Sequence, residues 1–304
     1  MSRLIFAAAL IFFFGIPVIL SADNNKNDND RCLVSKTKSI GDLENIRSYC
    51  DELSKIRANI TLGEKYSEED NLERNKKAIS YFLKAIDIIE KSSQKDEYKT
   101  WEFISFKYMS YVYSNKKFSL DKFLEITKKA YGLSQEIGIN DNPITYNMVV
   151  ANYRKALALK YMGKTEGDYG KYLRESILYS GLLVKSESNM HKTYTLDILA
   201  RIANEFDQDC DKATEYYNTI SRDLLSLPQY QYVITNMING YMSCAEKANK
   251  TLAKDNNRDE MLEKETCKKI KEWYMAALNI SNDKKLKGKI ADRLKNVCKK
   301  CSCK

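Results

Sequence analysis

Turn-forming residues are scarce in this chain, whose 304 residues include 3 Pro and 11 Gly. Proteins built from short strands need a turn every few residues, and Gly and Pro supply many of those turns. Long helices joined by polar loops do not have this requirement. The 10 Phe and 21 Tyr residues add large side chains that can fill the space between packed helices. The composition therefore predicts an all-α protein.

The first 22 residues are typical of a secretory signal peptide. Arg3 supplies a positive charge, Leu4 to Leu20 form an apolar run, and Ser21 or Ala22 offers a small residue at a cleavage point. The apolar run has about 17 residues, which is at the short limit for a spanning helix, so an uncleaved anchor is the alternative. Residues 23–38 begin with a polar stretch and are expected to be flexible. We therefore predict a secreted or periplasmic protein.

Two patterns of residues recur along the chain at helical spacing. The first is a small or apolar residue, an aromatic residue four positions later, and a small or apolar residue three after that, all on one helical face. Its copies are Ala78, Phe82 and Ala85; Ala213, Tyr217 and Ile220; and Ile270, Tyr274 and Ala277. The second pattern lies upstream of such segments: a large residue, an apolar residue three positions later followed by a small or apolar one, and an aromatic residue three positions after that. Its copies are Trp101, Ile104, Ser105 and Tyr108, and Tyr146, Val149, Val150 and Tyr153; weaker copies are Leu196, Leu199, Ala200 and Ala203, and Ile234, Met237, Ile238 and Tyr241. Small residues would let two helices approach closely while the aromatic ring fills the gap.

Together these patterns resemble the two helices of the tetratricopeptide repeat. The resemblance covers about residues 39–280 in four to five helical hairpins, and it implies a right-handed α-solenoid with a repeat domain at 39–282. Successive first helices are roughly 38 to 50 residues apart instead of about 34, and these copies lack the family's first-helix Gly and closing Pro. We therefore expect a divergent repeat with elongated helices. A non-repetitive bundle is the alternative, because any amphipathic helix pair places aromatics three and four positions apart.

Polar and turn-forming segments mark where these helices end. Residues 163–167 (Gly-Lys-Thr-Glu-Gly) separate a helix near 145–162 from one near 168–185, and residues 140–143 (Asn-Asp-Asn-Pro) precede the former. Leu227 and Pro228 precede a helix at about 230–247, and the first helix is expected at about 39–57.

The resemblance also implies where a partner would bind, because the inner helices of such repeats line a concave groove. The groove positions carried over from the motif are Glu102, Phe106, Met109, Asn147, Arg154, Asp197, Arg201, Asn204, Thr235 and Asn239. Asn side chains suit an extended peptide, since each offers a donor and an acceptor. The alternative is that these residues form solvated helix faces.

The eight Cys residues are an even number, and export would place them where disulfides persist. They are Cys32, Cys50, Cys210, Cys244, Cys267, Cys298, Cys301 and Cys303. A Cys32–Cys50 bridge would tie the N-terminal segment to the first helix. By elimination, Cys210, Cys244 and Cys267 would pair with the three C-terminal Cys residues, although sequence alone does not fix the connectivity. The C-terminal thiols could instead bind a soft metal, but oxidation is expected after export, and no metal or other cofactor is predicted.

The C-terminal segment 283–304 is basic and Cys-rich. It carries +7 of the formal net charge of +9, so the rest of the chain is nearly neutral. Leu286, Ile290, Leu294 and Val297 follow helical spacing with Lys on the other faces. This pattern is typical of a helix that caps a repeat array, and also of a basic helix on a membrane surface.

Motifs for catalysis are absent from the sequence. The one His residue, His191, is interpreted as an inert surface residue. Because the sequence has a single His, catalytic sites that need two imidazoles are excluded. No phosphate-binding loop, dinucleotide-binding turn or serine-nucleophile elbow occurs. Asp207, Asp209 and Asp211 are read as a solvated loop and helix cap. A hydrolase with two carboxylates remains a minor alternative.

The sequence therefore predicts a scaffold, not an enzyme, that binds another protein or peptide through its groove or rim. Attachment to a polyanion or an anionic membrane surface through the basic segment is the alternative, and no nucleic acid is expected. Three Asn-x-Ser/Thr sites, at Asn59, Asn249 and Asn279, would matter only in a eukaryotic host.

Overall fold

A computed structural model describes residues 32–115, 117–254 and 260–301. These residues are mainly helical and contain no strand, which confirms the all-α prediction. The chain divides into two compact units that meet between Leu183 and Val184. Each unit is described by itself below. The predicted signal peptide at 1–22 lies outside the described residues.

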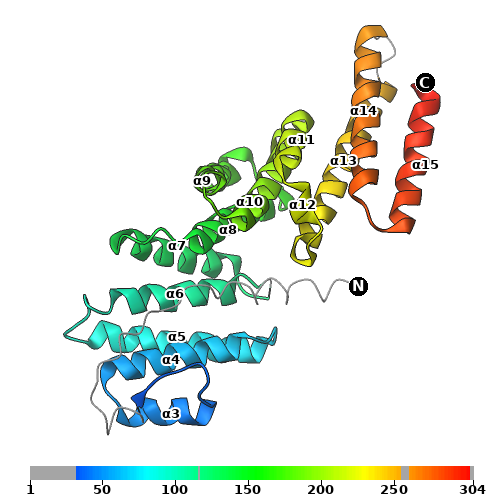
Figure 1. Ribbon diagram of the computed structural model, residues 1–304. Helices are drawn as coiled ribbons and strands as arrows, with labels where there is room; N and C mark the ends of the chain where they lie inside the picture. The colour runs from blue at the N-terminus through cyan, green and yellow to red at the C-terminus, as the bar shows by residue number, and fades with distance from the viewer. Residues whose placement is uncertain (1–31, 116, 255–259, 302–304) are drawn as a thin grey trace. The chain divides into compact units, whose positions relative to one another are not determined.

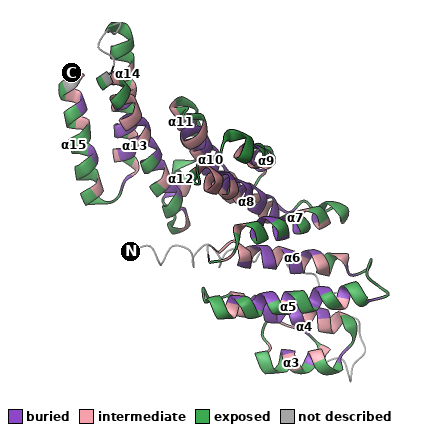
Figure 2. Cartoon of the chain, turned by 180° about the vertical axis from the view of Figure 1, so that it is seen from behind, coloured by how far each residue is buried: buried purple, intermediate pink, exposed green. Residues whose placement is uncertain are grey.

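In the first unit, each helix from α3 to α7 packs against the next one along the chain (Figure 1). The helices are α3 (Ile40–Tyr49), α4 (Glu52–Ser67), α5 (Leu72–Lys91), α6 (Lys99–Tyr113), α7 (Leu120–Glu136), α8 (Asn142–Tyr161) and α9 (Glu166–Val184). Buried positions run along α5 and α6, and exposed positions cover much of α9 (Figure 2). Because neighbours in sequence are neighbours in space, most of this core forms between consecutive helices.

Polar side chains begin most of these helices, as expected for helix N-termini. Asp141 accepts a hydrogen bond from the backbone N–H of Ile144, and Pro143 lies in the first turn of α8. The predicted break at 140–143 is therefore confirmed. The single first helix expected at 39–57 is wrong: α3 ends at Tyr49, and α4 begins at Glu52. Asp51 caps α4 by accepting from Ser54 N at 2.7 Å, so the chain starts a new helix there.

A close contact between a glycine and an aromatic ring joins α4 to α5. Ala78, Phe82 and Ala85 of α5 have no exposed surface, as their helical spacing predicted. Gly63 of α4 faces Phe82 so closely that a Cβ atom at position 63 would lie 2.4 Å from Phe82 Cε1. The missing side chain thus lets the two helices approach each other, and the ring fills the space between them.

We predict that Gly63→Ala lowers the free energy of unfolding by about 2 kcal/mol, because the new methyl group would force the buried ring to move. Gly132→Ala is the matched control, since Gly132 is an exposed residue of α7 with no atom within 4 Å of the new Cβ. That change should stabilise the protein by up to about 1 kcal/mol through helix propensity. Urea unfolding of both variants measures the difference; equal effects would contradict the close contact.

The second unit contains α10 (Asn189–Ile202), a π-helical turn (Ala203–Asp207), α11 (Cys210–Thr219), α12 (Arg222–Leu225), a 3-10 turn (Pro228–Tyr230), α13 (Gln231–Lys254), α14 (Glu260–Ile280) and α15 (Lys284–Lys300). The predicted break at 227–228 before a long helix is confirmed. The close contact of the first unit recurs here: a Cβ on Gly240 of α13 would lie 2.5 Å from Tyr217 Cε2 of α11. Tyr217 and Tyr274 are among the largest fully buried side chains.

Helix α15 buries the apolar stripe that its sequence predicted. Ile290 and Val297 are buried in the core of the second unit, and Leu286 and Leu294 pack against that core. Arg293 of α15 pairs with Glu246 of α13. Residues 284–300 therefore form a packed helix of this unit, and the lysines at 284, 285, 287, 289, 295 and 299 are exposed.

Three disulfides join Cys residues that lie within a Cα–Cα distance of 5.5–5.7 Å. Cys32–Cys50 is confirmed as predicted, and Cys267–Cys301 fastens α15 to α14. The expectation that Cys210 and Cys244 would pair with the C-terminal Cys residues is wrong, because these two form a bridge with each other. Helices α11 and α13 pack together, which brings the two residues into contact. Cys303 lies outside the described residues.

The disulfides suggest an oxidising, extracellular environment, because such bonds seldom persist in the cytosol. Within the described ranges, no helix combines the length and the apolar character needed to cross a membrane.

We predict that the double change Cys267→Ser and Cys301→Ser destabilises the second unit by about 3–4 kcal/mol, because the bridge closes a loop of 34 residues. Amide hydrogen exchange should show α15 losing protection before α13 and α14. Unchanged protection in α15 would mean that its apolar stripe holds it without the bridge.

Candidate functional site

A hollow of about 410 Å³ lies on the first unit, along helices α5, α6 and α7. It contains two of the residues predicted to bind a partner, Phe106 and Met109. We call this hollow the α5–α7 groove, and the residues that line it are Leu83, Ile86, Asp87, Glu90, Phe106, Met109, Tyr113, Lys122, Glu125, Ile126 and Lys129. Within each helix, the lining residues are adjacent or lie three or four positions apart. Each helix therefore contributes one of its faces to the groove.

The floor of the α5–α7 groove is apolar. Ile86, Phe106, Met109 and Ile126 are at most 7% exposed and belong to the core of the first unit. Leu83 stands at the edge with 48% of its surface exposed. A floor held in place by the core is preorganised, and an exposed apolar side chain beside it adds surface that a partner could cover.

The two rims of the groove carry different charges. The α5 rim presents Asp87 and Glu90, and Lys91 neutralises part of this charge through an ion pair with Asp87 at 2.8 Å. On the α7 rim, Glu125 lies between Lys122 and Lys129, at 2.7 and 3.7 Å. One rim is therefore acidic and the other has a net positive charge.

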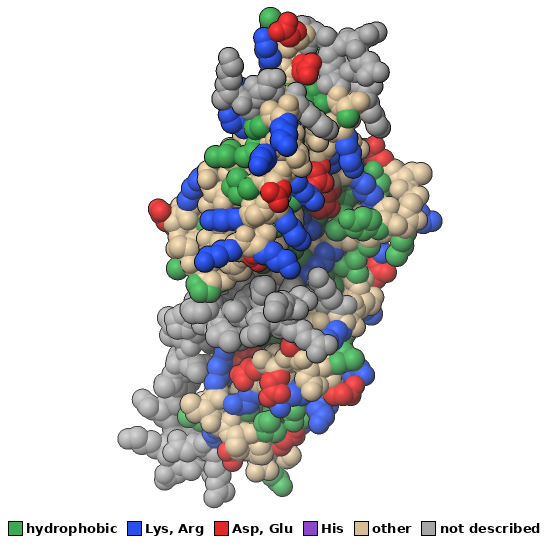
Figure 3. Space-filling view, turned by 90° about the vertical axis from the view of Figure 1, so that its right-hand side faces the viewer, with side chains coloured by type: hydrophobic (Ala, Val, Ile, Leu, Met, Phe, Trp, Pro, Cys, Tyr) green, Lys and Arg blue, Asp and Glu red, His purple; other side chains and the backbone are tan. Residues whose placement is uncertain are grey.

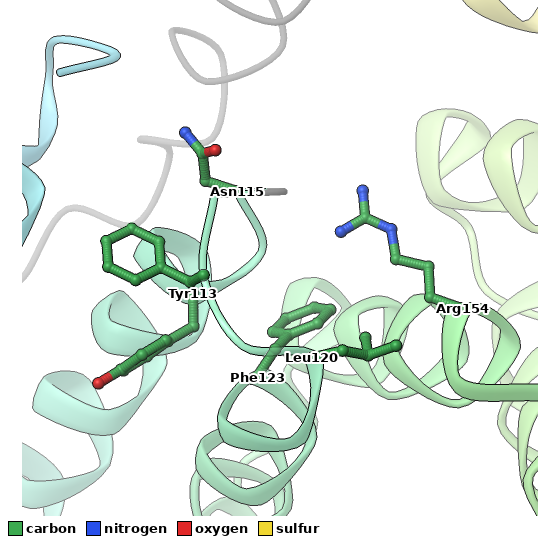
Figure 4. Close-up of a pocket in the computed structure, with 6 residues that line it drawn as sticks. Tyr113, Asn115, Leu120, Phe123 and Arg154 are labelled. Atoms are coloured by element: carbon green, nitrogen blue, oxygen red, sulfur yellow. The ribbon is translucent and has the colours of Figure 1, made fainter. Parts of the chain in front are cut away.

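A smaller hollow of about 170 Å³ lies where α6 ends and α7 begins (Figure 4). Its lining residues are Tyr113, Asn115, Phe118, Leu120, Phe123 and Arg154. Tyr113 lines both hollows. The Arg154 guanidinium donates to the carbonyl of Ser114 at 2.6 Å and lies 5.9 Å from the ring centroid of Phe123. Arg154, another predicted groove residue, therefore also fixes the end of α6 onto α8.

Two further predicted residues of the first unit have other surroundings. Asn147 is buried, and its amide donates to Ser110 Oγ at 2.9 Å, while Ser110 is also hydrogen-bonded to Thr127. This chain of polar groups joins α6, α7 and α8, so the Asn147 amide holds helices together. Glu102 is half-buried, and burial raises the pKa of its carboxyl.

The predicted residues of the second unit divide between its surface and its interior. Thr235 and Asn239 are exposed on α13. Arg201 is half-buried and donates to the Tyr232 hydroxyl at 3.0 Å. Asn204 lies buried in the π-helical turn, where its side-chain oxygen accepts from Lys247 at 2.8 Å. The Asn204 and Asn147 side chains thus serve the protein's own packing.

Asp197 is a buried carboxyl group between α10 and α13. It is 2% exposed, and its Oδ2 accepts from Asn236 Nδ2 at 2.7 Å. Its Oδ1 has no hydrogen-bond partner among the described residues. Burial raises the pKa of Asp197 to about 7, against the opposing effects of Arg201 and Asn236. The group therefore gains a proton in the folded protein near neutral pH.

This pKa predicts a pH dependence of stability. Because the folded state binds a proton that the unfolded state has already released, the Asp197 contribution falls as pH rises from about 4 to about 7. Asp197→Asn should remove this loss, on the order of 4 kcal/mol at pH 8 relative to pH 4. Urea unfolding across this range tests it, with the exposed Asp292→Asn as control. Parallel profiles for wild type and Asp197→Asn would contradict the prediction.

The other polar residues that the sequence singled out belong to the second unit. His191, interpreted from sequence as a surface residue, is in fact 6% exposed, with its Nδ1 2.7 Å from Ser188 Oγ. Asp207, Asp209 and Asp211 are exposed, and Asp209 caps α11 as predicted. No cluster of three His, Cys, Asp or Glu side chains suited to a metal occurs in the described part of the chain.

The three Asn-x-Ser/Thr sites differ in exposure. Asn59 is 2% exposed, and its amide donates to the carbonyl of Lys55 at 2.8 Å. Asn249 is half-buried, and Asn279 is exposed near the end of α14. Only Asn279 is thus fully accessible in the folded unit.

Sequence reasoning missed the two walls of the α5–α7 groove. The family resemblance directed attention to first helices such as α6, whereas the walls come from α5 and α7. A signal was present, because Leu83, Ile86 and Glu90 occur at spacings of three and four. That spacing alone does not show that two helices on either side of α6 leave space between them.

Comparison with known proteins gives no further guide to this site. No protein-family model, no curated protein and no solved structure matches the chain. The functional conclusion therefore depends on the geometry of the groove.

Proposed function

We propose that the protein is an exported helical scaffold that binds another protein by seating an amphipathic segment of it in the α5–α7 groove. The observation that carries this proposal is an apolar floor between two rims of different charge. A volume of a few hundred Å³ above an apolar floor lies in the size range of ligand-binding sites. The export part of the proposal is supported by the disulfides and by the apolar run at 4–20.

We also propose that the helices form a divergent tetratricopeptide-like, right-handed solenoid. The consecutive packing of α3 to α7 supports this arrangement. Helix α4 carries Leu62, Gly63 and Tyr66 at the spacing of the family's first-helix motif, and the hairpin of α4 and α5 is thus a further copy with that glycine. The contact of Gly63 with Phe82 gives that motif its physical purpose. In this arrangement α15 would close the C-terminal end of the array, which otherwise exposes apolar surface.

The rims indicate what the partner segment carries. A helix laid between α5 and α7 would place apolar side chains every three or four residues on the floor. Basic side chains on one flank would face Asp87 and Glu90, and an acidic flank would face the α7 rim. Opposite rim charges favour one orientation of such a segment and reject the reverse one.

The experiment is selection of a displayed library of helical peptides on the full-length protein with its disulfides intact. Leu83→Glu combined with Glu90→Lys places a charge at the edge of the floor and reverses the acidic rim. We expect this double variant to lose at least about tenfold in affinity for the selected peptides, since changing a hot-spot residue of an interface costs about 2 kcal/mol or more.

The control is Leu178→Glu combined with Glu187→Lys. Leu178 is 65% exposed on α9, outside the α5–α7 groove, and Glu187 is exposed, so the variant makes the same changes elsewhere. Its affinity should match that of the wild type. Selected peptides that bind both variants equally, or that lack an amphipathic pattern, would overturn the groove proposal.

A further inference from the structure

The outer surface of α15 carries a dense row of lysines. Lys284, Lys285, Lys287, Lys289, Lys295 and Lys299 are all exposed, and Asp292 is the one acidic residue between positions 284 and 299. We call these six lysines the α15 lysine row. Figure 3 shows lysine and arginine side chains gathered on the face that carries this helix.

The α15 lysine row has little charge compensation within the protein. None of its six members forms an ion pair with another described residue, whereas Arg293 on the same helix pairs with Glu246. Lys285 and Lys289, like Lys295 and Lys299, are four residues apart, a spacing at which like charges destabilise an isolated helix. The helix tolerates this repulsion because its other face is packed in the core and its end is joined to α14 by Cys267–Cys301.

The packing of α15 decides between two kinds of anionic partner. A helix that attaches to a membrane surface must insert its apolar face among the lipids. In α15 that face is already buried, with Ile290 and Val297 at most 3% exposed. The surface left to a partner is charged, so binding would be electrostatic and sensitive to salt.

The side chains of α15 also bear on the kind of polyanion. Binding of single-stranded nucleic acid relies on aromatic side chains that stack against bases, and residues 284–301 contain no Phe, Tyr or Trp. Lysine ammonium groups are compact charges that need no planar bidentate partner. From Lys284 to Lys299 the helix extends on the order of 20 Å, so a linear anion with repeated charges could contact several lysines together.

We propose that the α15 lysine row binds a sulfated or uronic-acid-rich polysaccharide. The oxidising, extracellular environment suggested by the disulfides is where such chains occur. This site is independent of the α5–α7 groove, and it is held rigid by the core of the second unit before any ligand arrives.

The test measures binding of heparin fragments to the full-length protein by calorimetry at several salt concentrations. The triple variant Lys284→Glu, Lys295→Glu and Lys299→Glu is compared with Lys95→Glu, Lys164→Glu and Lys185→Glu. Both variants have the same net charge, and all six positions are exposed. We expect the first variant to lose at least about tenfold in affinity and to show a shallower salt dependence. The second should stay within about twofold of the wild type.

A neutral variant, Lys284→Gln with Lys295→Gln and Lys299→Gln, replaces the charge-reversal variant if charge reversal disturbs folding. A thermal melt followed by circular dichroism checks that each variant is folded. Equal losses in both charge-reversal variants would show that net charge alone attracts heparin, and this would overturn the proposal. Binding to phosphatidylserine vesicles at physiological salt without binding to heparin would also overturn it, in favour of a membrane surface.

Discussion

Both units of this protein depend on the close approach of paired helices, in which a residue without a side chain faces an aromatic ring. Gly63 admits the ring of Phe82 between α4 and α5, and Gly240 admits that of Tyr217 between α11 and α13. A ring buries a large apolar area in one contact, and the glycine allows that contact at a short interhelical distance. Ala78 and Ala85 flank Phe82 on the same buried face of α5, and their small side chains allow the neighbouring helix to approach.

Two of the three disulfides involve the first and the last helices that the structure describes. Cys32–Cys50 fixes the N-terminal segment beside α3, and Cys267–Cys301 fixes the last helix. Terminal elements have a neighbour on one side only, so they bury less apolar surface than the elements between them. Covalent bonds compensate for that lack and make α15 a rigid support for its lysines.

The two proposed binding sites, the α5–α7 groove and the α15 lysine row, lie in separate units. The groove has an apolar floor between charged rims, whereas the lysine row has charge without apolar surface. A scaffold with both could hold a protein partner while attached to an anionic polymer. The buried Asp197 adds a third property, because its raised pKa links the stability of the second unit to pH.

Local sequence patterns predicted that the chain is helical, where α8, α9 and α13 begin to within three residues, and that Phe82 and Tyr217 are buried. They also favoured a Cys32–Cys50 bridge, although sequence alone does not fix the connectivity. These properties follow from local spacing and from residue chemistry, which act within one or two helices. Three features became evident only in the folded protein: Cys210 pairs with Cys244, Asn147 and Asn204 hold helices together, and α5 and α7 provide the groove walls. Each of these depends on which faces meet across helices, and a helical period fixes a face without naming its neighbour.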